Sequence, residues 1–270
     1  MAYSIFIHDI LETFMCLITF AYKSHPKYKF ILAANRDEFY ARSTAVAHWW
    51  EDHSNILGGR DMEALGTWMA IHKNGRFAAV TNFRDIKKIK SDARSRGDLP
   101  VNFLLGKERP SVYSRHVHSE GDQYNGFNLI TLDEEMAHVS NYDGDAKLLD
   151  PGVYGLSNAL LETPWPKVKK AKRAFNTLIQ QSFSLEDLIE MMQDTETALD
   201  EELPETGLDY EREKAVSAMC IRTPDYGTCC STAVTIDYDG NVAFLEKSYP
   251  VGERKEGEVK VEFTIDKSMP

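Results

Sequence analysis

Cys16 has a nucleophilic side chain and stands at the start of a predicted strand. It opens an apolar, β-type run at residues 16–22 and follows directly on Met15. Cysteine attacks a carbonyl carbon as the thiolate and needs a base nearby. If Cys16 were the first residue of the mature chain, its own α-amino group, with an ordinary pKa near ~7.7–8.0, could take the thiol proton. The alternative is a buried strand cysteine without a catalytic role, which is common for free cysteines.

The segment before Cys16 decides between these interpretations. Residues 1–14 contain apolar side chains, but Asp9 and Glu12 interrupt them and no basic stretch precedes them. A signal peptide or a membrane span is therefore not predicted. We expect residues 1–15 to be an N-terminal extension, a misassigned start or a propeptide, and residues 16–270 to form a single domain.

A second group of candidate residues closes the next apolar run, at residues 28–35, where the sequence continues as Arg36-Asp37-Glu38. In a functional interpretation the arginine supports a thiolate and the carboxylate of Asp37 orients an amine, a role that Glu38 could also take. In the ordinary interpretation these charges form a solvated turn.

Two asparagines stand at the ends of predicted strands. Asn82 closes Val80-Thr81-Asn82, and Asn158 follows Gly155-Leu156-Ser157. A side-chain amide can donate a hydrogen bond to a developing oxyanion, and asparagine is equally common in turns. Neither asparagine by itself distinguishes an oxyanion donor from a turn residue.

Hairpins dominate the elements that would position these residues. Asn74-Gly75 and Asp239-Gly240 are strong two-residue hairpin turns. Residues 48–50 and 56–59 fall in a loop-rich region. The pattern predicts strands at 16–22, 28–35, 67–72, 77–82, 126–132, 137–142, 152–156, 215–221, 230–237, 242–247 and 259–265, with helices from Asp98, at 165–182 and at 185–193. Strands that do not alternate with helices favour an α+β fold with antiparallel sheets over a Rossmann or barrel fold.

Composition and charge exclude several classes of protein. A chain of 270 residues, 43% of them apolar, can bury a substantial core. A formal net charge of −11 argues against nucleic acid as a partner. Four cysteines form neither a disulfide framework nor a zinc-site spacing, which predicts a reducing compartment, the cytoplasm. The histidines are scattered, so we predict no metal site.

A series of segments resembles one known family along nearly the whole chain. The series is similar to the NRDE family of N-terminal-nucleophile (Ntn) hydrolase-like proteins, which includes the transport-and-Golgi-organisation 2 proteins, from Met15 to about Ile265. Its segments, in order, are MCLI at 15–18, LAANRDEFY at 32–40, GTW at 66–68, VTNFR at 80–84, YNGFNL at 124–129, YGLSN at 154–158, ETPWPK at 162–167 and YGT at 226–228.

The resemblance implies a four-layer αββα sandwich with two antiparallel sheets, and a family chain that starts at the methionine corresponding to Met15. It also implies site residues, by similarity to cysteine Ntn hydrolases such as penicillin V acylase, bile salt hydrolase and acid ceramidase. Those hydrolases have a further arginine later in the chain. The corresponding position in this sequence is Cys229, and Arg222 lies close to it in the sequence. The matching positions are Cys16, Arg36, Asp37, Asn82 and Asn158.

Two functions from different classes follow from the resemblance. The first is a cysteine amidohydrolase that acts on a non-peptide C–N bond of a small-molecule amide and requires no cofactor. The second is a non-enzymatic haem-binding or haem-trafficking protein with haem as its cargo, for which Cys229-Cys230, Trp49-Trp50 and the histidines are candidate contributors. No motif selects among those contributors.

Overall fold

The hairpin of β1 (Cys16–Tyr22) and β2 (Tyr28–Phe39) forms the middle of the first sheet in this computed structural model, which describes residues 16–269. Every residue of β1 is buried, and β2 is buried without a break from Phe30 to Glu38. Strands buried on both faces must lie between two packed layers. The predictions for residues 1–15 fall outside the described residues.

The first sheet has six antiparallel strands, with β1 and β2 flanked by strands from the second half of the chain. The strand order is β10-β1-β2-β11-β12-β13, in which the added strands are β10 (Gly152–Leu156), β11 (Tyr226–Asp237), β12 (Asn241–Ser248) and β13 (Gly257–Thr264).

The second sheet has seven strands that follow one another in chain order, each antiparallel to the next. They are β3 (Thr44–Trp49), β4 (Ile56–Asp61), β5 (Met69–His72), β6 (Phe77–Asn82), β7 (Phe127–Leu132), β8 (Met136–Ser140) and β9 (Lys147–Leu148). The Asn74-Gly75 turn joins β5 to β6, as predicted, and Gly75 has a positive φ of 92°.

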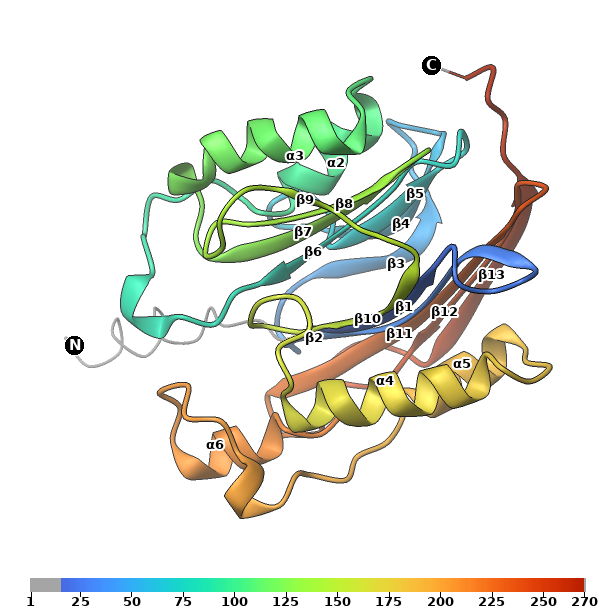
Figure 1. Cartoon of the computed structure of the whole chain (residues 1–270). Helices are drawn as coiled ribbons and strands as arrows, with labels where there is room; N and C mark the ends of the chain where they lie inside the picture. The colour runs from blue at the N-terminus through green and yellow to red at the C-terminus, as the bar shows by residue number, and fades with distance from the viewer. Residues whose placement is uncertain (1–15, 270) are drawn as a thin grey trace.

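The two sheets face each other, and helices cover their outer faces (Figure 1). Phe20 and Phe30 of the first sheet pack with Phe77 and Ile130 of the second in one shared core. Helices α2 (Asp98–Leu105) and α3 (Pro110–Ser119) cover the seven-stranded sheet, and α4 (Pro166–Leu178) and α5 (Leu185–Met191) cover the six-stranded sheet. The predicted α+β fold with four αββα layers and two antiparallel sheets is confirmed.

Among residues 16–269, the remaining helices are short. They are α6 (Tyr210–Ala215) and three 3₁₀ turns, η1 (Ile86–Lys88), η2 (Gly121–Gln123) and η3 (Asp200–Glu202). Within residues 16–269, no helix combines the length and the apolar character needed to cross a bilayer.

Two sequence predictions about local structure are wrong. Residues 48–50 and 56–59, predicted to lie in a loop-rich region, belong largely to β3 and β4, and Gly58 supplies close packing rather than a turn. A Cβ there would lie 2.6 Å from the carbonyl oxygen of Met69. Residues 215–221 do not form a strand, since their main chain bonds elsewhere: Cys220 N–H donates to the Asp194 carbonyl and Ile221 N–H to Thr228 Oγ1.

Candidate active site

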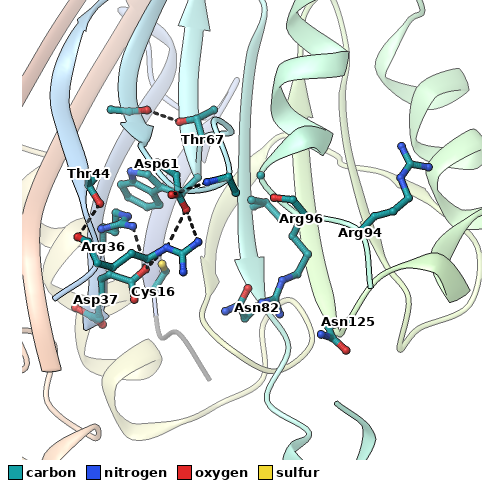
Figure 2. Close-up of a pocket in the computed structure, with 18 of the residues that line it drawn as sticks. Cys16, Arg36, Asp37, Thr44, Asp61, Thr67, Asn82, Arg94, Arg96 and Asn125 are labelled. Carbon is teal, nitrogen blue, oxygen red and sulfur yellow. Dashed lines mark hydrogen bonds and ion pairs between the residues drawn. The ribbon is translucent and has the colours of Figure 1, made fainter. Parts of the chain in front are cut away.

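A cavity of about 260 Å³ opens between the two sheets, where β1 begins and β2 ends (Figure 2). Cys16 and Asn82 come to it from opposite sheets, and Arg96 and neighbouring residues of the 93–97 segment close its far side. The lining is Cys16, Arg36, Asp37, Glu38, Arg42, Thr44, Gly59, Asp61, Ala64, Thr67, Trp68, Val80, Asn82, Ala93, Arg94, Ser95, Arg96, Gly97 and Asn125. Charged side chains therefore gather at one end of the core between the two sheets.

Cys16 reaches the cavity because it is the first residue of β1. It pairs directly with Arg36 of β2, so the two side chains emerge on the same face of the sheet. Ile18 and Phe20 share that face and belong to the core between the sheets, which places the thiol between the sheets as well. Ser157 Oγ donates a 2.8 Å hydrogen bond to the Cys16 carbonyl and holds the start of the strand.

The thiol of Cys16 is strongly disposed to keep its proton. Burial, and then the neighbouring Asp37 carboxylate, raise its pKa to about 12, although Arg36 acts in the opposite direction. A thiol with this pKa is almost wholly protonated at neutral pH. Nucleophilic use of Cys16 therefore requires a base within reach of its sulfur.

Arg36 is held beside the thiol by a buried carboxylate. Its Nη2 lies 3.0 Å from Glu38 Oε2, and the Phe39 N–H donates to Glu38 Oε1 at 2.8 Å. Burial raises the pKa of Glu38 to about 7, against the effect of Arg36. Arg36 Nη1 has no hydrogen-bond partner within residues 16–269. The guanidinium therefore keeps a donor that could contact a ligand or a thiolate.

Asp37 points to the other side of β2, as strand alternation requires. Thr228 Oγ1 donates a 2.6 Å hydrogen bond to its Oδ1, whereas its buried Oδ2 lacks a partner among the described residues. Burial raises the pKa of Asp37 to about 7, and Lys167 is the strongest charge acting against that rise. Asp37 thus offers one open carboxylate oxygen close to the start of β1.

The raised pKa of Asp37 predicts how Asp37→Asn changes stability with pH. A carboxyl whose folded pKa exceeds its unfolded value of 3.8 loses stability as pH rises from about 4 to about 7. Asparagine removes this loss and keeps an acceptor for Thr228. We expect the melting temperature of the variant, relative to the parent, to increase by a few degrees between pH 4.5 and 7.5, since about 1 kcal/mol corresponds to ~2–4 °C in a domain of this size. Thermal melts followed by circular dichroism test this, and an unchanged difference contradicts it.

The two predicted asparagines have different surroundings. Asn82, at the end of β6, lines the cavity, and its buried Nδ2 has no partner among residues 16–269. Asn158 lies behind it, where its Nδ2 donates to the Asn82 carbonyl at 2.9 Å and its Oδ1 accepts from Ser157 Oγ at 3.1 Å. Four of the five predicted site residues therefore meet at the cavity, and the fifth, Asn158, supports Asn82.

Cys229 and Arg222 both lie away from the cavity lining. Cys229 sits at a bulge between β2 and β11, with its sulfur 3.6 Å from the Gly227 carbonyl and 3.8 Å from that of Glu38. Arg222 donates to the Thr228 carbonyl at 2.9 Å, and its guanidinium carbon lies 4.4 Å from the centroid of the Tyr249 ring. The cavity instead contains Arg42, which pairs with Asp61 at 2.7 Å.

The sequence pattern did not single out Lys167, a buried lysine whose charge interacts with Asp37 and Cys16. Lys167 is 2% exposed, in the first turn of α4. Its spacing of four and eight residues from Ala171 and Phe175, both buried on the six-stranded sheet, is the signal that could have identified it. A lysine in the apolar stripe of an amphipathic helix is unusual enough to examine.

The part of the chain described here holds no group of three or more His, Cys, Asp or Glu side chains that could bind a metal ion. Trp50 is buried in the core, and Trp49 packs edge-on against Phe263 with 5.4 Å between ring centroids, so this pair serves packing.

Comparisons with known proteins match the chain over most of its length. The family model for Transport and Golgi organisation 2 matches residues 15–250. The Homo sapiens "Transport and Golgi organization protein 2 homolog" is 38% identical over 275 residues, or 93% of this chain and 99% of that protein. The Bos taurus homologue is 38% identical over 257 residues, 87% of this chain and 93% of that protein. Among solved structures, a Caenorhabditis elegans N-acylethanolamine-hydrolyzing acid amidase ortholog has a TM-score of 0.42 and 12% identity, covering 81% of this chain and 92% of that one.

Proposed function

Since the chain belongs to the Transport and Golgi organisation 2 family, whose name states no chemistry, we propose its activity from the site: a cysteine amidohydrolase of small linear amides. Cys16 is the nucleophile, acting after release of residues 1–15. The observation that carries the proposal is that Cys16, Asp37 and Asn82 all line one cavity, and that Asp37 Oδ2 and Asn82 Nδ2 have no hydrogen-bond partner among residues 16–269.

The proposed reaction begins with a proton transfer inside Cys16. The α-amino group takes the proton from Sγ, and the sulfur attacks the amide carbonyl carbon. Asn82 Nδ2 donates to the oxyanion that forms. The α-ammonium returns the proton to the leaving nitrogen, the C–N bond breaks, and a thioester remains. Water, deprotonated by the same amine, then releases the acid and restores the thiol.

A free α-amino group also offsets the high pKa of the Cys16 thiol. The ammonium group that forms when the α-amine takes the thiol proton favours the thiolate. In this proposal Asp37, whose Oδ2 has no hydrogen-bond partner among residues 16–269, holds that group. Arg36, paired with Glu38, adds a second cation on the same face of the sheet. The charges around Cys16 thus suit an N-terminal cysteine better than an internal one.

The size and lining of the cavity favour a small, polar amide. Its volume of about 260 Å³ is below the ~300–1,000 Å³ of pockets that hold drug-sized ligands, and charged side chains make up much of the wall. Haem as cargo stays a prediction, which a haem titration tests: a Soret shift together with tryptophan quenching supports it. A cytoplasmic location is also proposed, supported by four free thiols. Detection of the tagged protein in a secretory compartment would oppose it.

The first test is the intact mass of the protein expressed from its own gene. The proposal predicts a chain that begins at Cys16, because only then does the nucleophile carry its own base. That protein is then screened against linear N-acyl amides of chromogenic amines. A mature protein that keeps residues 1–15 would remove the mechanism.

A further inference from the structure

Lys167 is a buried charged residue to which the mechanism above assigns no role. The Lys167 side chain is 2% exposed, and its Nζ finds no hydrogen-bond partner among the described residues. An ammonium group buried without a partner is costly, and apolar side chains of similar volume pack such positions more favourably. Unusual buried charges beside a cavity are candidates for function.

The charges that act on Lys167 come from four elements around the base of the cavity. They are Asp37 on β2, Cys16 on β1, Arg84 after β6 and Glu213 on α6. Arg84 Nη1 and Glu213 Oε1 pair with each other at 2.7 Å, which largely neutralises those two charges. Asp37 is therefore the acid left to balance Lys167.

Asp37 and Lys167 each depend on the other for their charge. Burial lowers the pKa of Lys167 to about 8, and Asp37 is the strongest influence in the opposite direction. Burial raises the pKa of Asp37 to about 7, and Lys167 opposes it most, followed by Thr228, Arg222 and Arg36. Without the ammonium group the pKa of Asp37 would rise further, and a smaller fraction of its carboxyl would be ionised and able to act as an anionic acceptor at neutral pH.

We propose that Lys167 is a positioning residue of the Cys16 site, which keeps Asp37 ionised so that the open Oδ2 of Asp37 can hold the α-amino group of Cys16. The second half of this inference rests on the proposed function, while the ionisation of Asp37 by Lys167 does not. In the reaction, Asp37 fixes the direction of the amine lone pair toward Sγ and stabilises the α-ammonium after proton transfer. Lys167 contacts neither the substrate nor the sulfur and acts through Asp37.

The direct test is the titration of the Asp37 carboxyl, followed by NMR in protein labelled with ¹³C at the aspartate carboxyl carbons. Asp37→Asn identifies the signal. We expect Lys167→Met, which keeps the apolar stem, to raise the Asp37 midpoint by about one pH unit or more, and Lys167→Arg to restore it. An unchanged midpoint in Lys167→Met, or a Lys167→Arg variant that behaves like it, overturns the inference.

Reciprocity supplies a second measurement, which covers the case that Lys167→Met does not fold. If Asp37 and Lys167 stabilise each other's charge, Asp37→Asn must lower the Lys167 midpoint in protein labelled with ¹³C at the lysine ε-carbons, with Lys167→Arg identifying the signal. An unchanged midpoint overturns the inference equally.

Turnover separates the two proposals. With an amide substrate in hand, we expect the acid limb of the kcat/KM profile to move to higher pH in Lys167→Met and to return in Lys167→Arg. If Cys16→Ala leaves turnover unchanged, the hydrolase mechanism fails, and the carboxyl titration still decides the role of Lys167. If the titration shows no coupling while Cys16→Ala is inactive, the role of Lys167 fails alone.

Discussion

Cys16→Ala should reduce hydrolysis of a small linear amide by at least about 10³-fold, since loss of a covalent nucleophile removes the route through the thioester. The fold should survive, because alanine fits a buried strand position and the Ser157 hydrogen bond is to the main-chain carbonyl of Cys16. The measurement is kcat/KM on purified protein whose mass begins at residue 16, with thermal melts to verify folding.

Cys230→Ala is the matched control for this variant. Arg36 pairs with Cys16 on one side and with Cys230 of β11 on the other, and burial raises the pKa of both thiols. Cys230 lies outside the cavity lining, so its variant should stay within a few-fold of the parent. Equal losses from the two substitutions would mean that a general effect on the sheet, and not nucleophilic attack, explains the result.

Asn82→Ala should lower kcat by about 10²–10³-fold, the usual cost of removing one oxyanion donor. Its stability should change little, because Nδ2 has no partner within residues 16–269 and alanine keeps the main-chain carbonyl that Asn158 contacts. The effect should fall on kcat more than on KM, since the oxyanion exists only in the transition state and the tetrahedral intermediate.

Asn128→Ala provides the contrast for Asn82. Asn128 is directly paired with Thr81 in β7 and β6, and its Nδ2 donates to Thr81 Oγ1 at 3.2 Å and to the Ala159 carbonyl at 3.0 Å. It does not line the cavity, so its loss should cost about 1–3 kcal/mol of stability and leave kcat nearly unchanged. An Asn82 variant that is destabilised to the same degree with kcat intact would assign Asn82 a structural role.

The amino-acid sequence determined the parts of this protein that depend on neighbours along the chain. Alternation and hairpin turns predicted most of the strands, the Asn74-Gly75 turn among them, because side-chain direction and turn geometry are local properties. Cys16 and the Arg36-Asp37-Glu38 run stood out for the same reason: reactive residues border apolar runs, and strand pairing brings them together at one end of a sheet.

Tertiary structure decided which polar atoms remain open, because hydrogen-bond partners come from distant segments. Asn82 and Asn158 are equivalent candidates in the sequence. Asn158 Nδ2 donates to the carbonyl of a residue 76 positions away, whereas Asn82 Nδ2 has no partner among residues 16–269. In the sequence Lys167 is one of several basic residues of α4. The packing of α4 on the six-stranded sheet buries it within range of the Asp37 charge. Burial and long-range pairing set the charge of a site, and neither is a property of a short segment.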